Sequence, residues 1–83
     1  MSETYQTAIG TEEGFGRRLR ELRDDRKLTR AKGAEGARIS VESWASYERG
    51  RTHPTLFNLI RITMVLGLKD DEVIYLVLGD RSE

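Results

Sequence analysis

The sequence predicts an all-α fold, a compact bundle of about five short helices in a single domain. Apolar residues recur at the spacing of one helical face in several segments, and short polar stretches or glycines separate these segments. The chain has 83 residues and no cysteine, so a small core without disulfides must supply its stability. These features favour closely packed helices or a dimer.

The first expected helix covers residues 12–26. Thr11 can cap its start, where two glutamates suit the positive end of the helix dipole. Three apolar residues at helical spacing form its expected inner face: Phe15, Leu19 and Leu22.

Two further helices, at 30–37 and 41–49, are expected with a tight connection between them. Thr29 and Ser40 are suitable N-caps, and Gly50 is a suitable stop for the second helix. The first helix contains two glycines, and each is about 1 kcal/mol less favourable than alanine there. It therefore depends on its neighbours for stability.

The 41–49 helix has two different sides. Val41, Trp44 and Tyr47 follow one stripe that can face a core. The other side is small or polar and comprises Glu42, Ser43, Ala45, Ser46 and Arg49. Such side chains leave room for a bulky, flat partner, so the rest of the chain is expected to present this helix.

Two helices, at 55–66 and 70–78, complete the predicted bundle. Thr55 caps the first of them and Gly67 ends it. Its expected inner face comprises Leu56, Leu59, Ile60, Met64 or Thr63, and Leu66. Three acids begin the last segment, as suits a helix N-terminus, but its six consecutive apolar residues also suit a strand. A helix is favoured.

The net charge is zero, but its distribution is uneven. Residues 16–51 hold eleven Lys or Arg against six Asp or Glu, a local charge of +5, whereas the flanking segments carry −3 and −2. Exposed charges act over only about 8 Å in physiological salt, so the local excess matters more than the total. The basic part surrounds the 41–49 helix.

Residues suited to catalysis or metal binding are sparse. No nucleophile–base pair is evident, and Leu19 stands where a GxGxxG phosphate loop would need glycine. His53 is a lone histidine, and the acids at 70–72 suit a helix start. We therefore expect no enzymatic activity, no cofactor and no metal site.

The organisation of the chain is expected to be simple. Residues 1–10 are polar and without periodicity, as in a flexible lead-in, the domain spans 11–79, and 80–83 form a C-terminal tail. The longest apolar run, 73–78, is too short to span a bilayer, and no secretory signal opens the chain. A soluble cytoplasmic protein without a membrane partner is expected.

Residues 15–68 resemble the lambda-repressor/Cro-like (XRE-type) helix-turn-helix family. The resemblance depends on the order and spacing of many residues, which end in Tyr-Glu-Arg-Gly and then Pro-Thr-Leu. These residues are Leu19, Leu22, Arg23, Leu28-Thr29, Ala34-Glu35, Ile39-Ser40, Tyr47-Glu48-Arg49-Gly50, Pro54-Thr55-Leu56, Leu59 and Leu66-Gly67.

The resemblance implies a DNA-binding site. The 30–37 helix would cross the phosphate backbone and the 41–49 helix would enter the major groove. Positions matching base readers are Val41, Glu42, Ser43 and Ser46, while Arg30 could reach a phosphate or a guanine. Positions matching phosphate contacts are Thr29, Ser40, Arg49, Arg51, Thr52 and His53. Arg23 and Glu48 match an internal ion pair of the family.

Three residues depart from the family pattern. Gly33 replaces a leucine, and Trp44 stands where a smaller aliphatic residue is common, so the tryptophan is expected to fill the volume left by the glycine. Arg38 replaces the usual glycine of the turn, at a cost of roughly 1 kcal/mol if the turn needs a positive φ.

Two functions are compatible with these features. The first is a sequence-specific transcriptional regulator, a homodimeric repressor that reads a pseudo-palindromic operator on double-stranded DNA. The dimer contact is expected at Tyr75 and Leu78, and the setting would be bacterial or phage-encoded and nucleoid-associated. The alternative is an antitoxin-like or regulator-binding module that uses the same fold to bind a protein partner, because the reading face carries Glu42 and no Lys or Arg.

Overall fold

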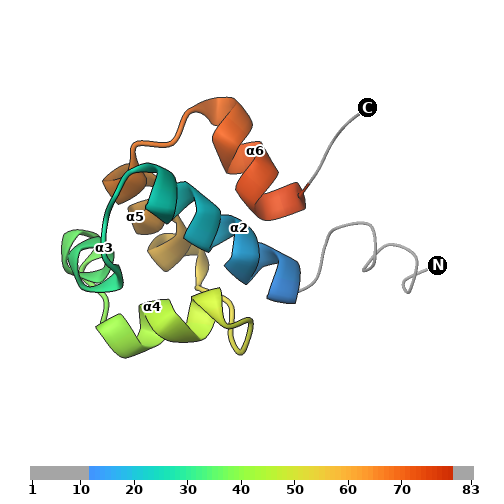
Figure 1. The fold of residues 1–83 in the computed structure, drawn as a ribbon. Helices are drawn as coiled ribbons and strands as arrows, with labels where there is room; N and C mark the ends of the chain where they lie inside the picture. Colours follow the sequence, from blue (N-terminus) through green and yellow to red (C-terminus); the bar gives the residue numbers. More distant parts are fainter. Residues whose placement is uncertain (1–11, 80–83) are drawn as a thin grey trace.

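Five α-helices and no strands make up residues 12–79, the part of the chain that the computed structural model describes (Figure 1). They are α2 (Glu12–Asp25), α3 (Arg30–Ala37), α4 (Val41–Glu48), α5 (Leu56–Leu66) and α6 (Asp70–Leu78). The all-α prediction is confirmed, and the last segment is a helix rather than a strand. The expected lead-in (1–10) and tail (80–83) lie outside the described residues.

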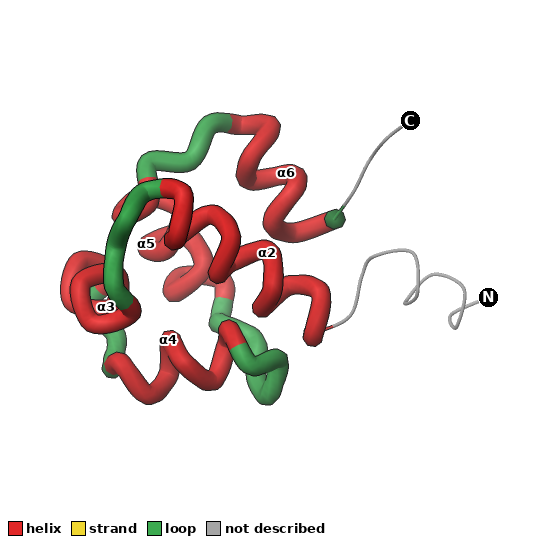
Figure 2. The backbone as a smooth tube through the Cα atoms, viewed as in Figure 1, coloured by secondary structure: helices red, strands yellow, loops and turns green. Residues whose placement is uncertain are grey.

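The core is assembled from all five helices, which surround it with short connections (Figure 2). Its four largest fully buried side chains come from four different helices: Leu19, Trp44, Ile62 and Leu76. Helix α3 contributes Ala34 and Ala37, which are small enough to bring it close to its neighbours. Burial of each large side chain contributes about 1.5–3 kcal/mol, so this shared core holds α4 in place.

Two glycines permit close packing against α4. A Cβ at Gly33 would lie 2.8 Å from Cη2 of Trp44, closer than real contacts allow. The tryptophan ring therefore occupies the space that Gly33 leaves, as predicted. At Gly16 a Cβ would lie 2.5 Å from the carbonyl oxygen of Tyr47, so α2 and α4 approach through their backbones.

The predicted inner face of α5 is partly wrong. Leu56, Ile60 and Met64 were expected in the core but are 67%, 44% and 74% exposed. Leu66 is buried and Leu59 is packed against the core as predicted, whereas Ile62, which was not predicted, is fully buried. The sequence of α5 is apolar on two sides, so helical spacing alone cannot select which side turns inward. The other side remains on the surface.

Two helices end with residues in the left-handed region. Arg38 after α3 has φ 62° and ψ 41°, and Gly67 after α5 has φ 64° and ψ 43°. The backbone N–H of Arg38 donates to the carbonyl oxygen of Glu35 at 3.1 Å. The turn between α3 and α4 therefore has the positive φ that makes arginine unfavourable there.

Within residues 12–79, no helix is both long and apolar enough to cross a membrane. The same part of the chain contains no group of three or more His, Asp or Glu side chains arranged to hold a metal ion.

Candidate nucleic-acid interface

The outer side of α4 is open. Val41 and Glu42 are exposed, and Ser43 and Ser46 are half-buried, whereas Trp44 is completely enclosed on the inner side. Ala45 was expected on the outer side and is buried, because its position lies at the border between the two sides. Figure 1 shows α4 along one edge of the molecule, with the remaining helices on one side of it. The helix can therefore be approached from outside along its polar side.

Hydroxyl groups order this surface. The backbone N–H of Ser43 donates to Oγ of Ser40 at 3.0 Å, and the two serine hydroxyls are 2.9 Å apart. The hydroxyls of Ser46 and Thr52 are 2.8 Å apart and join α4 to the following loop. Thr29 caps α3 by accepting from the N–H of Lys32 at 3.0 Å.

The loop after α4 adds positive charge beside these hydroxyls. Arg49, Arg51, Thr52 and His53 are all exposed. The imidazole ring of His53 meets the ring of Phe15 edge-on, with centroids 5.7 Å apart. Neither Arg49 nor Arg51 forms an ion pair within residues 12–79. Both guanidinium groups can therefore meet an anion.

A buried ion pair fixes the C-terminal end of α4 to α2. Nε and Nη2 of Arg23 donate to the two carboxylate oxygens of Glu48, at 2.6 and 3.1 Å. Nη1 of Arg23 donates to the carbonyl oxygen of Leu28 at 2.7 Å. The side chain of Glu48 has no exposed surface. This is the pairing that the family resemblance implies.

Two further donors reach the same carboxylate. Nε of Arg30 donates to Oε1 at 2.9 Å, and Nε1 of Trp44 donates to Oε2 at 2.6 Å. Burial alone raises the pKa of the Glu48 carboxyl, but the hydrogen bonds from Arg23, Arg30 and Trp44 outweigh it and leave the pKa below its usual value. The sequence reasoning missed both donors, although Trp44 and Glu48 have the i, i+4 spacing that brings side chains together on a helix.

The two residues expected at a dimer contact differ in accessibility. The hydroxyl of Tyr75 donates to a carboxylate oxygen of Glu21, and its ring lies 6.0 Å from the guanidinium carbon of Arg18. Tyr75 is thus engaged with α2 of its own chain. Leu78 is 47% exposed and available to a partner.

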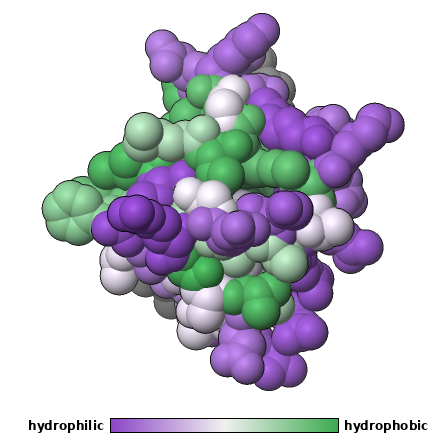
Figure 3. Space-filling model, turned by 90° about the vertical axis from the view of Figure 1, so that its left-hand side faces the viewer, coloured by the Kyte–Doolittle hydropathy of each residue, from purple (hydrophilic) through white to green (hydrophobic). Residues whose placement is uncertain are grey.

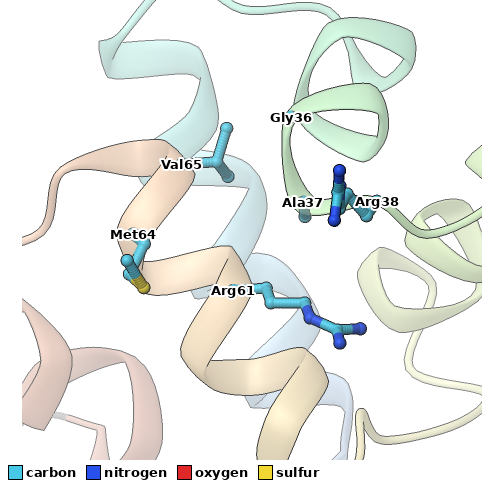
Figure 4. A pocket seen from close by; sticks show the side chains of 6 residues that line it. All are labelled: Gly36, Ala37, Arg38, Arg61, Met64 and Val65. Atoms are coloured by element: carbon cyan, nitrogen blue, oxygen red, sulfur yellow. The ribbon is translucent and has the colours of Figure 1, made fainter.

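A groove of about 270 Å³ lies between the C-terminal end of α3 and α5. It is lined by Gly36, Ala37, Arg38, Arg61, Met64 and Val65. Figure 4 shows the side chains of Arg38 and Arg61 extending from opposite walls into the same space. No acid lines the groove, so it suits an anionic group beside an apolar one; the sequence alone did not predict it.

Comparison with known protein families identifies the type of domain that contains α3 and α4. Residues 15–76 match a helix-turn-helix domain family. The chain belongs to this family. The match spans all of α3, α4 and α5, and it confirms the family assignment made from the sequence.

Two solved structures resemble this helix-turn-helix domain over most of its length. One is the restriction-modification controller protein C.AhdI from Aeromonas hydrophila, with 27% identity, a TM-score of 0.70, and coverage of 75% of this chain and 94% of that chain. The other is the clp gene regulator ClgR from C. glutamicum, with 29% identity, a TM-score of 0.70, and coverage of 78% and 84%. No curated protein matches the chain significantly.

Proposed function

We propose that the protein is a sequence-specific DNA-binding transcriptional regulator that acts by binding rather than by catalysis. The observation that carries this proposal is the two-sided character of α4. Its outer side is solvent-accessible and polar, whereas buried Trp44 and Glu48 anchor its inner side in the domain. A rigid helix with small outward side chains fits the major groove of duplex DNA. Similarity to a controller protein and a gene regulator supports the same function.

The proposed interface divides into two kinds of contact. The outward side chains at the start and middle of α4 would read base edges: Val41, Glu42, Ser43 and Ser46. Glu42 suits the amino group of a cytosine. The exposed hydroxyl, guanidinium and imidazole groups around α4 would contact phosphates: Thr29, Ser40, Arg49, Arg51, Thr52 and His53. The regulator would then repress by occupying a promoter on a bacterial or phage genome in the cytoplasm.

Selection of bound duplexes from a random library, followed by titration of the selected site, tests this function. We expect one preferred site and an affinity that falls steeply between 50 and 200 mM salt, because released counterions contribute to binding. Absence of binding to any duplex at low salt and tens of micromolar protein would refute it.

A homodimer is the proposed functional unit. Four large apolar side chains of α5, which we call the α5 stripe, lie within one arc of the helix and are 44–74% exposed: Leu56, Phe57, Ile60 and Met64. Figure 3 shows apolar side chains gathered on the side where α3 and α5 lie. Exposed apolar surface of this kind favours contact with a second copy, with Leu78 as a further candidate.

A dimer would place two α4 helices about 34 Å apart, one turn of DNA, and would read a pseudo-palindrome. Sedimentation velocity over a range of concentrations tests the association, and the spacing of the selected half-sites gives an independent measure. A monomer at all concentrations together with a single half-site would refute it.

The groove between Arg38 and Arg61 favours a second candidate function, a module that binds an acidic segment of a protein partner. Two guanidinium groups beside Met64 suit a carboxylate next to an apolar side chain. Titration with a short acidic–apolar peptide distinguishes the two functions, because DNA would not compete for a groove separate from the outer side of α4.

A further inference from the structure

The guanidinium of Arg30 is hydrogen-bonded at Nε and accessible to solvent at its terminal nitrogens. Its Nε–H donates to buried Glu48, whereas its side chain is 34% exposed. Within residues 12–79, its two terminal nitrogens have no hydrogen-bond partner. A guanidinium has five N–H donors, so the four on the two terminal nitrogens remain available.

Two arginines reach the carboxylate of Glu48, but they differ in their other partners. Arg23 is nearly buried, and its donors are directed to Glu48, Leu28 and Asp24. Among residues 12–79, Arg30 has no partner other than Glu48, so its guanidinium is the one that can accept an anion. The one acid in α3, Glu35, lies 3.9 Å from Lys32 of the same helix. No acid on α3 neutralises Arg30.

The position of Glu48 determines where Arg30 can act. Glu48 is the last residue of α4, seven positions after Val41 and two after Ser46, the first and last of the candidate base readers. Along the helix axis it is about 10 Å from Val41 and about 3 Å from Ser46. The anchor of Arg30 therefore follows the last of the base-reading positions. Arg30 is also the first residue of α3 and follows the N-cap Thr29, where the helix dipole favours an anion.

We propose that Glu48 is a positioning residue that fixes Arg30 as a contact to a DNA phosphate, independent of base sequence. This inference rests on the proposed DNA-binding function. The buried carboxylate orders the arginine side chain before binding, so less conformational entropy is lost when the phosphate is contacted. Under this proposal Arg30 contacts a phosphate and not a guanine.

Titration of the selected duplex and of a scrambled duplex over a range of salt tests the role of Arg30. Arg30→Ala should weaken binding to both duplexes by the same factor, about tenfold, and lower the salt slope by about one. Arg30→Lys should recover only part of the affinity, because its single ammonium cannot serve Glu48 and a phosphate through separate edges.

A double-mutant cycle tests the role of Glu48. Glu48→Gln should weaken DNA binding in the wild-type background and have no further effect in the Arg30→Ala background. Arg23→Lys is the matched control, since it disturbs the same carboxylate without touching the proposed phosphate site. All variants are assayed at a temperature where circular dichroism shows them folded. If Glu48→Gln does not fold, binding of the two Arg30 variants to the two duplexes still tests whether Arg30 contacts a phosphate.

Three results would overturn the inference. A loss confined to one base pair of the selected site would make Arg30 a base reader. Unchanged affinity in Arg30→Ala would place it outside the interface. Equal effects of Glu48→Gln with and without Arg30 would make Glu48 a purely structural residue. By contrast, failure of the wild-type protein to bind any duplex would refute the proposed function itself.

Discussion

The outer sides of α4 and α5 are supported by one core but differ in chemistry. Trp44 and Ile62 are both fully buried and anchor the two helices. Outward, α4 presents Glu42 and serine hydroxyls, whereas α5 presents the α5 stripe. A polar, hydroxyl-rich surface suits a hydrated nucleic-acid interface, and an apolar one suits a dry contact with a protein. Buried side chains therefore explain why both helices are fixed in place. The exposed side chains determine which kind of partner each helix suits.

The inner attachments of the two helices also differ. Helix α4 depends on a buried carboxylate with donors from three residues. Helix α5 is held by aliphatic packing and by uncharged acceptors, with Asn58 donating to the Tyr47 hydroxyl and the Leu66 carbonyl oxygen accepting from Arg26. Removal of one member of a buried ion cluster leaves unpaired charge, which is more costly than loss of the cluster as a whole. Substitution of Glu48 is therefore expected to have the largest effect on stability.

Glu48→Ala is expected to destabilise the fold by about 3–5 kcal/mol, because it leaves Arg23 and the Trp44 N–H without their shared acceptor. Chemical denaturation monitored by circular dichroism measures this loss. Glu72→Ala is the matched control: Glu72 pairs with Arg26 at 2.8 Å at a more exposed site, so its removal should cost much less. Equal losses of stability in both variants would show that the buried Glu48 cluster stabilises the fold no more than the more exposed Glu72–Arg26 pair does.

Acid titration provides a second measurement on the same carboxylate. Because the pKa of Glu48 is lower in the folded protein than usual, the unfolded chain binds more protons as the pH falls through this range. The contribution of Glu48 to stability is therefore complete above its ordinary pKa and is lost as the pH decreases below it. Glu48→Gln should have a flatter dependence of stability on pH in the acid range, whereas an unchanged dependence would contradict this.

The fit between Gly33 and Trp44 allows a test of how α3 is held to α4. Gly33→Leu should destabilise the protein by about 2–3 kcal/mol, because the added side chain overlaps the indole ring. In a Trp44→Leu background the same substitution should cost less. Thermal unfolding of the two single variants and the double variant measures the coupling, with Ala31→Leu on the exposed side of α3 as the control. Additive effects of the two substitutions on stability would contradict a coupling between positions 33 and 44.

The sequence was sufficient to predict what depends on local spacing. Helix positions follow from caps such as Thr29, Ser40 and Thr55, each of which accepts from a backbone N–H in the structure. The complementary fit of Trp44 and Gly33 was also predictable, since both depart from one family pattern. Local propensity and pattern agree here, as they do in sequences with a single folded state.

The features that were missed depend on choices that spacing does not determine. Helix α5 has apolar residues on two sides, and only packing against the other helices selects Ile62 rather than Ile60 or Met64 as an inner residue. The bond between Arg30 and Glu48 joins residues 18 positions apart and has no periodic signal. The groove between Arg38 and Arg61 likewise joins two helices that are distant in sequence.

Phe57→Asp tests whether the apolar outer side of α5 serves a second copy. A charge in the centre of a dry contact should weaken dimerisation about tenfold or more, while the monomer, in which Phe57 is 70% exposed, should keep its stability. Sedimentation velocity and thermal unfolding measure the two properties separately. Leu78→Asp is the matched control on α6; a larger effect there would move the contact to the helix where the sequence placed it.

The smallest expected effect concerns the two left-handed helix ends, which share a conformation but not a residue. Arg38→Gly should stabilise the protein by about 1 kcal/mol, because glycine adopts positive φ without a Cβ clash, and Gly67→Ala should destabilise it by a similar amount. Apart from Gly67 and its two chain neighbours, no residue has an atom within 4 Å of a Cβ built at this position, so Gly67→Ala reports backbone conformation alone. Urea denaturation measures both. A loss of stability in Arg38→Gly would mean that the arginine side chain contributes more to the folded state than its unfavourable backbone conformation costs.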